Sequence, residues 1–224
     1  MTIKAINLRG SPYLGIFCST TDEIALIPEF VEQKESKRIA ETLGVETLPT
    51  RLADSPLIGV LSRGYGKKFT LANCTQEEEV DALRAMGIDT LVLRDTSAVG
   101  NLVHVNRHAG LISHLIPEKD RVAIEAFFGK VLHRSTIAKS DLAGACLVGN
   151  ERGYLVHPKA EAAEMQKIED WLKIPGMRTT ANYGDPFIGN SILANKHGIM
   201  VGELTSGPEL ARIDEGLNPG LIMR

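Results

Sequence analysis

The feature that most constrains the fold is an apolar residue followed by glycine, which recurs five times along the chain. The five steps are Leu14-Gly15, Ile58-Gly59, Val99-Gly100, Ala143-Gly144 and Ile188-Gly189. Successive glycines are 44, 41, 44 and 45 positions apart. A period of this length is typical of repeat folds and fits helical HEAT units and four-stranded propeller blades equally well. The content of each repeat must therefore decide the architecture.

Each glycine is followed by two β-prone stretches and then by a helical one. The first stretch leads through a polar turn into an apolar run, a pattern that predicts two strands joined by a hairpin. The apolar runs are Ala25-Leu26-Ile27, Phe69-Thr70-Leu71, Gly110-Leu111-Ile112, Tyr154-Leu155-Val156 and Ile199-Met200-Val201. Apolar residues at spacings of three and four then predict a helix with one buried face, as in Met165, Ile168 and Leu172.

Proline, a capping pattern and glycine mark the expected helix ends. The prolines at expected helix starts are Pro28, Pro117, Pro158 and Pro208. The second repeat carries instead the capping-box pattern of Thr75 and Glu78. The glycines expected to end helices in the left-handed conformation are Gly44, Gly87, Gly129 and Gly216.

A third β-prone segment follows each helix except the last. These segments cover residues 45–48, 90–93, 131–134 and 177–180. The stretch Ile3 to Leu8 precedes Gly15 in the same way, so its pairing with the last repeat would close a ring and remove two exposed sheet edges. The sequence therefore predicts an α/β fold of five ββαβ repeats in one domain spanning residues 1–224.

The repeated glycines have two structural explanations. In a closed ring, five first strands approach a common axis, where side chains would collide. Alternatively, each glycine serves a local turn or bulge.

Composition limits the classes of function. The chain is 43% hydrophobic and 24% charged, as expected of a folded protein, and has no apolar run long enough to span a bilayer. We therefore expect a cytoplasmic protein, and we expect a monomer because a closed ring leaves no sheet edge that demands a partner. Its formal charge of -3 disfavours non-specific nucleic-acid binding. The three cysteines, Cys18, Cys74 and Cys146, lie far apart, so neither a disulfide framework, a metal site nor a cofactor is expected.

Several stretches resemble the translation initiation factor six family, in its archaeal form, over essentially the whole chain. They are residues 96–103 (TSAVGNLV), 149–158 (GNERGYLVHP), 192–198 (ILANKHG) and 205–210 (TSGPEL). The resemblance implies the pentein fold, a propeller with five-fold pseudo-symmetry. It also implies a ribosome biogenesis and anti-association factor that binds the large ribosomal subunit and sterically blocks the small one. Implied partners are a ribosomal protein of the intersubunit face, the sarcin–ricin loop of the rRNA and a release machinery.

The hairpin tips are the expected ribosome-binding surface, because repeat symmetry places them on one face. Four tips are polar and partly basic, and the first, residues 20–23, is acidic. The candidate contact residues are Arg63, Tyr65, Lys67, Asn101, Asn106, Arg107, Asn150, Arg152, Asn195 and Lys196. Arginine and asparagine suit phosphate and backbone oxygens, but solvated turns explain the same residues. For Asn101, an inward hydrogen bond that fixes strand register is the alternative.

A guanidine-modifying enzyme of the pentein class is the competing interpretation. The resemblance among those enzymes implies a nucleophilic cysteine in the final repeat, whereas no cysteine follows Cys146 here. Thr205 and Ser206 have no evident activating base. His104 and His108 flank a predicted strand and turn, where a spacing of four does not align metal ligands. We therefore expect no catalysis, and a propeller with another protein partner stays open as a third possibility.

Overall fold

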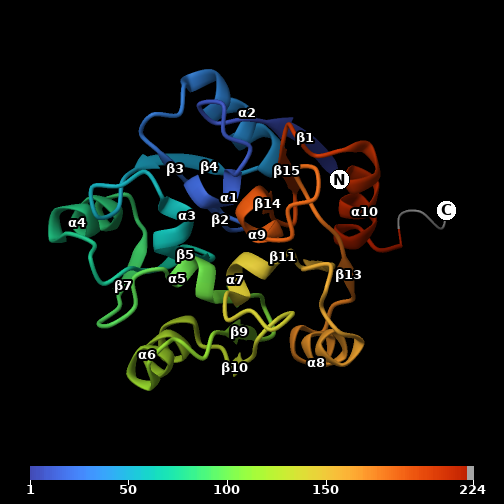
Figure 1. Ribbon diagram of the computed structural model, residues 1–224. Helices are drawn as coiled ribbons and strands as arrows, with labels where there is room; N and C mark the ends of the chain where they lie inside the picture. Colours follow the sequence, from blue (N-terminus) through green and yellow to red (C-terminus); the bar gives the residue numbers. More distant parts are fainter. Residues whose placement is uncertain (221–224) are drawn as a thin grey trace.

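The computed structural model describes residues 1–220 as five three-stranded sheets arranged around a central axis (Figure 1). The inner strands are β2 (Ser19–Thr20), β5 (Ser62–Tyr65), β8 (Val103–Val105), β11 (Leu147–Gly149) and β14 (Ile192–Ala194). The central strands are β3 (Ile24–Pro28), β6 (Lys68–Leu71), β9 (Gly110–Ile112), β12 (Tyr154–Val156) and β15 (Gly198–Gly202). The outer strands are β4 (Glu46–Thr50), β7 (Asp89–Val92), β10 (Leu132–Arg134), β13 (Gly176–Arg178) and β1 (Thr2–Ile6).

Each sheet pairs its inner and central strands as an antiparallel hairpin and its outer strand in parallel, as in the first sheet of β2, β3 and β4. In the first four sheets a long helix carries the chain from the central to the outer strand, because parallel neighbours need a crossover. The long helices are α2 (Gln33–Leu43), α4 (Glu77–Ala85), α6 (Glu118–Phe128), α8 (Ala162–Leu172) and α10 (Gly207–Leu217). The predicted α/β ring of five ββαβ repeats is confirmed.

The N-terminal strand closes the ring. β1 pairs in parallel with β15, in a register that runs from Thr2 opposite Gly198 to Ile6 opposite Gly202. The last sheet therefore takes its outer strand from the opposite end of the chain, and α10 leads to no strand within residues 1–220. The strand ends two residues before the expected limit, because Leu8 forms an isolated bridge with Ser11.

The core is divided among five apolar clusters, one between each pair of neighbouring repeats. All five residues of β3 and of β15 are buried, since each strand is flanked by two others and covered by a helix. Helix α2 contributes Ile39 and Leu43, which lie four residues apart on its buried face. Removing such apolar area from water is the main stabilising term for each repeat.

The apolar-glycine steps begin one-turn helices rather than strands, which corrects the sequence expectation. These are α1 (Leu14–Phe17), α3 (Ile58–Leu61), α5 (Val99–Leu102), α7 (Ala143–Cys146) and α9 (Ile188–Ser191). Each has four residues, too few to leave a helical period in the sequence. The inner strand follows directly in four repeats, for example β5 after α3, and Cys18 alone separates α1 from β2.

The five glycines pack against one another around the axis. A Cβ atom on any of them would overlap the carbonyl oxygen of the preceding glycine, and Gly15 completes the circle by contacting Gly189. Side chains are therefore excluded from this ring by backbone on every side. Of the two explanations, axial crowding is confirmed, although the crowded elements are the one-turn helices at the centre of Figure 1.

Several predicted helix ends are wrong. Pro28 ends β3, and Pro158 lies four residues before α8, whereas Pro117 and Pro208 do stand at helix starts. The capping box of α4 is formed by Gln76 and Glu79, one residue later than expected. Gly44, Gly87 and Gly129 do adopt positive φ.

Gly216 lies inside α10 and does not end it, since Asn218 is the C-cap. Its lack of a side chain has a packing reason, because a Cβ there would press on Leu155 and Met177. Helix α8, for which the sequence predicts no terminal glycine, ends with Lys173 in the left-handed conformation.

A carboxylate in the first turn of four long helices holds the loop that enters the same repeat. Glu79 accepts hydrogen bonds from the backbone N–H groups of Ala53 and Asp54 at 2.7 and 2.9 Å. The equivalent acceptors are Asp120 for Arg94 and Asp95, Glu164 for Ala138, and Glu209 for Tyr183 and Gly184. Three of these tight turns place two non-glycine residues at positive φ, so the carboxylates stabilise strained backbone.

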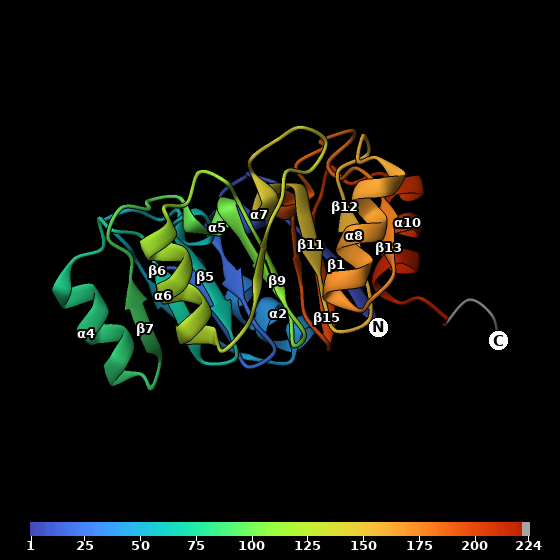
Figure 2. The ribbon, with the colours of Figure 1, turned by 90° about the horizontal axis from the view of Figure 1, so that it is seen from below.

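The ring has two distinct faces. Each inner strand runs from a one-turn helix on one face to a hairpin tip on the other, and Figure 2 shows α5 and α7 at the upper edge. We call the face made by the five tips the hairpin face. None of the helices within residues 1–220 has the length and apolar content needed to cross a bilayer.

Candidate functional site

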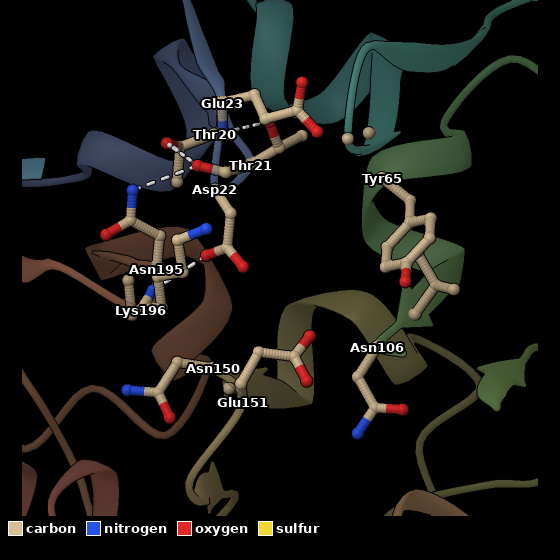
Figure 3. A pocket seen from close by; sticks show the side chains of 15 residues that line it. Thr20, Thr21, Asp22, Glu23, Tyr65, Asn106, Asn150, Glu151, Asn195 and Lys196 are labelled. Carbon is tan, nitrogen blue, oxygen red and sulfur yellow. Dashed lines mark hydrogen bonds between the residues drawn. The ribbon is translucent and has the colours of Figure 1, made fainter. Parts of the chain in front are cut away.

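The five hairpin tips surround a polar depression of about 210 Å³ at the mouth of the ring (Figure 3). Every repeat contributes to its lining, from Thr20 to Glu23 in the first to Asn195 and Lys196 in the last. The tips are short turns on paired strands, so their backbone positions are fixed by the sheets. This is the surface on which most of the predicted contact residues lie.

Three of those residues, Asn106, Asn150 and Asn195, are buried, with only 2% to 6% of each exposed. Each Oδ1 accepts two backbone N–H groups of its own turn, which fixes the hairpin in an Asx-type geometry. The donors are His108 and Ala109 for Asn106, Arg152 and Gly153 for Asn150, and His197 and Gly198 for Asn195.

The amide nitrogens of the same asparagines bind the next repeat. Asn106 donates to the carbonyl of Leu172 at 2.8 Å, Asn150 to Leu217 at 3.0 Å and Asn195 to Leu43 at 2.8 Å. Each acceptor is the last residue of a long helix, whose carbonyl has no partner within the helix. The polar atoms of these three side chains are therefore engaged within the ring, and their contact with the ribosome stays a prediction.

The second repeat makes the same connection with a different residue. Lys68 donates from Nζ to the carbonyl of Phe127 at 2.8 Å, near the end of α6. Four of the five repeat junctions thus carry a side-chain hydrogen bond from a hairpin to a neighbouring helix terminus.

Four cationic side chains remain exposed on the tips, namely Lys67, Arg107, Arg152 and Lys196. Arg107 forms an ion pair with Glu151 of the next hairpin, with Nε 3.1 Å from Oε2. Arg152 donates to the carbonyl of Lys196 at 3.1 Å. The arginines therefore bridge neighbouring tips, while the two lysines extend into solvent.

Acidic groups occupy the centre of the depression. Figure 3 shows the carboxylates of Asp22 and Glu151 directed toward its open middle, and Glu23 lies on the same rim. Asp22 accepts a hydrogen bond from the backbone N–H of Lys196 at 2.8 Å, which joins the first and last repeats. The hairpin face thus combines a cationic margin with an acidic centre.

Tyr65 is half-buried and held by its neighbours. Its ring lies edge-on to that of Phe128, with centroids 6.4 Å apart, and the Lys130 ammonium lies 5.1 Å from the Tyr65 centroid. Because the ring is already held in place, a partner that packs against its exposed surface would cost little side-chain conformational entropy.

Two predicted contact residues lie away from the tips. Arg63 is the second residue of β5, whose turn is at Gly66 and Lys67, and its side chain enters the interior of the ring. Asn101 belongs to α5, at the opposite end of β8 from Asn106, so it lies on the other face. No side-chain hydrogen bond of Asn101 occurs among residues 1–220.

The buried thiols are poorly suited to nucleophilic chemistry. Burial, reinforced by the charge of Glu35, raises the pKa of the Cys18 thiol far above its ordinary value, and burial also raises that of Cys146. A thiolate needs the opposite environment. The described residues also contain no cluster of three or more His, Cys, Asp or Glu side chains placed to hold a metal ion.

Comparison with known proteins decides the family. The eIF-6 family model matches residues 3–216, nearly the whole chain. The chain belongs to the eIF-6 family. Translation initiation factor 6 of Pyrococcus horikoshii is 34% identical to it, over 97% of this chain and 99% of that protein. The corresponding factor of Thermococcus onnurineus is 33% identical, over 97% and 98%.

A solved structure outside the eIF-6 family shares the fold. A variant of the N-terminal domain of ArgZ, covalently bound to a reaction intermediate, superposes with a TM-score of 0.55 over 81% of this chain and 74% of that one. The two sequences are 13% identical, so the likeness concerns the fold alone. The pentein architecture expected from the family resemblance is thereby confirmed.

Proposed function

We propose that this chain is a translation initiation factor that binds the large ribosomal subunit where it meets the small subunit, and keeps the two apart by steric occlusion. The match to the eIF-6 family over residues 3–216 carries the proposal. The partners would be a ribosomal protein of the intersubunit face and the sarcin–ricin loop of the rRNA. Release would require further proteins, and the factor would act as a cytoplasmic monomer.

The hairpin face is the surface proposed to dock. Its asparagine hydrogen bonds fix the tips before binding, so little conformational entropy is lost on association. Lys67 and Lys196 suit phosphate oxygens of the rRNA. The acidic centre around Asp22 and Glu151 suits basic side chains of a ribosomal protein, which gives complementarity to both kinds of partner.

Sedimentation tests the proposal directly. Purified protein is mixed with isolated large subunits and run on a sucrose gradient, then added to joining reactions with small subunits. We expect co-sedimentation with the large subunit and a dose-dependent loss of joined ribosomes. Protein that stays at the top of the gradient would contradict the proposal, and turnover of arginine-like substrates would favour the enzymatic alternative instead.

The docking surface is tested by reversing the charge of two tip lysines. The double variant Lys67→Glu with Lys196→Glu changes exposed side chains only, so folding should be preserved. We expect large-subunit affinity to fall by roughly ten- to a hundred-fold at low salt, and the salt dependence of binding to flatten, because phosphate contacts release counterions.

The matched control carries the same change of charge elsewhere. Lys119 on α6 and Lys139 in a turn away from the tips are also exposed, and both are replaced by glutamate. If this control lost affinity as much as the tip variant, the hairpin face would not be the docking surface.

A further inference from the structure

A second site is indicated inside the ring, at the residue four positions after each axial glycine. The five equivalent residues are Ser19, Arg63, His104, Val148 and Leu193. All five line an internal cavity of about 70 Å³ between the axial glycines and the hairpin face, which we call the axial channel. The three polar residues come from consecutive repeats, so they occupy one side of the channel, and the two apolar residues occupy the other.

Arg63 places an uncompensated charge in the axial channel. Its Nη2 donates to the carbonyl of Gly100, while its Nε is buried and has no hydrogen-bond partner among residues 1–220. No ion pair within those residues includes Arg63. Burial lowers its pKa to about 10, which still leaves the guanidinium charged at neutral pH. Arg63 as a whole is half-buried, and a charge withdrawn this far from bulk water normally requires a partner of opposite sign.

His104 supplies a second unpartnered group in the same layer. Its Nε2 is buried and has no hydrogen-bond partner among the described residues, and the residue is 5% exposed. Burial, followed by the charge of Arg63, lowers the pKa of His104 to about 3. The imidazole is therefore neutral at pH 7, and the tautomer protonated on Nε2 donates one hydrogen bond.

The chemistry of this layer selects an anion. Arg63 has N–H donors and no acceptor. His104 donates from Nε2, and the Ser19 hydroxyl is a third group that can donate a hydrogen bond. A water molecule needs about 10–15 Å³ of such space, so the axial channel has room for a chloride-sized ion with a few waters. We propose that the axial channel binds a small inorganic monoanion such as chloride between Arg63 and His104. This site is independent of ribosome binding.

Bromide locates the ion directly. Crystals of the whole protein are soaked in sodium bromide, and anomalous scattering is recorded at the bromine absorption edge. We expect a peak in the axial channel within hydrogen-bonding distance of Arg63 Nε and His104 Nε2. Ordinary water density there, without an anomalous peak, would overturn the proposal.

Measurements in solution test whether the ion also binds outside the crystal, where the halide is far less concentrated than in the soak. No chloride effect there would mean binding at crystal concentration only. Melting temperatures are compared in sodium chloride and in sodium gluconate of equal ionic strength, because gluconate is too large for the cavity. At about ten times the dissociation constant, chloride should raise the melting temperature by roughly 3–6 °C. Arg63→Gln should abolish this difference, whereas Arg152→Gln, a matched change at an exposed arginine, should retain it.

A second variant, which retains the guanidinium of Arg63, tests the site if Arg63→Gln does not fold. His104→Leu removes one donor and retains the guanidinium. We expect it to bind chloride at least several-fold more weakly, measured by the loss of protein-induced broadening of the 35Cl NMR line. Broadening equal to that of the wild type in His104→Leu would contradict the assigned site.

Discussion

At the residue scale, one type of side chain performs the same task in three repeats. Asn106, Asn150 and Asn195 each close a hairpin with the amide oxygen and bind a neighbouring helix end with the amide nitrogen. A backbone carbonyl at a helix terminus has no intrahelical partner, and burying it unpaired is unfavourable. The asparagines therefore stabilise both the turn and the junction between repeats.

Replacing Asn195 by alanine tests this role. The change removes the bonds to the carbonyls of Thr21 and Leu43 and leaves the Leu43 carbonyl, at the end of α2, without its side-chain partner, while the Thr21 carbonyl keeps the Thr20 hydroxyl at 3.3 Å. We expect the free energy of unfolding to fall by about 2–4 kcal/mol, measured by denaturant unfolding. Lys196→Ala, at the exposed neighbouring position, should change it by less than about 0.5 kcal/mol. Equal effects of the two variants would contradict a structural role for Asn195.

The axial glycines make a second prediction at this scale. A Cβ on Gly100 would overlap the carbonyl oxygens of Gly59 and Ser62, and the closed circle leaves no direction in which either can move. We expect Gly100→Ala to lower stability by at least about 2 kcal/mol in thermal or denaturant unfolding. Gly207→Ala is the matched control, because no heavy atom lies within 4 Å of the added Cβ, and it should shift stability by less than about 0.5 kcal/mol.

At the element scale, each long helix does more than cover a sheet. The carboxylate in the first turn of α4, α6, α8 and α10 binds the backbone of the loop that enters the same repeat. Negative charge is also favoured at a helix N-terminus. One side chain thus caps a helix and fixes a turn that would otherwise be strained.

The Glu209 carboxylate predicts a pH dependence of stability. Burial alone would raise its pKa, but hydrogen bonds from Thr180, Ser206 and Gly184 outweigh burial and lower the pKa from 4.5 to about 2. A depressed folded-state pKa contributes stability that is fully present above pH 4.5 and is lost as the pH falls toward 2. Glu209→Gln should therefore be less stable by about 1–3 kcal/mol at pH 7, with the difference from wild type shrinking below pH 4.5.

Unfolding curves recorded between pH 7 and pH 2 check this expectation. Glu215→Gln is the control, because Glu215 lies on the exposed face of the same helix. A constant difference between Glu209→Gln and wild type over the whole range would show that the folded-state pKa of Glu209 is not depressed.

Much of the element plan could be predicted from the sequence, because strands, crossovers and glycines recur at a fixed period. The one-turn helices could not, since four residues show no helical periodicity. The hydrogen bonds of the asparagines to neighbouring helix ends could not be predicted either, because Asn106 donates to a carbonyl that is 66 residues away in the sequence. The turn residues Gly64 and Gly66 predict that Arg63 lies on a tip, although its spacing of four from Gly59 matches that of the channel-lining residues in the other repeats.

At the scale of the whole molecule, stability depends on how the ring is closed. β1 buries Ile6 and, just beyond the strand, Leu8 is also fully buried. Asp22 and Asn195 add hydrogen bonds between the first and last repeats. We propose that residues 1–224 behave as one domain, because each repeat takes contacts from both neighbours.

Removing the closing strand tests this view. Deletion of residues 1–8 should lower the melting temperature by about 10 °C or more, since it removes two buried side chains and a strand of the last sheet. Ile6→Ala serves if the truncated chain does not fold, with an expected loss of about 2–5 kcal/mol. Lys4→Ala, exposed on the same strand, should be neutral. An unchanged melting temperature after deletion would contradict a stabilising closure.

The pairing of β1 with β15 also sets the timing of folding during synthesis. Asn7 accepts a hydrogen bond from Glu203, which is translated 196 residues later. At about 5–20 residues per second, the first strand waits roughly 10–40 s for its partner. A nascent chain can therefore assemble its earlier repeats in order, but β1 can pair only after β15 has been translated. A translation product that stops before β15 would leave the edge of a sheet exposed to pairing with other chains.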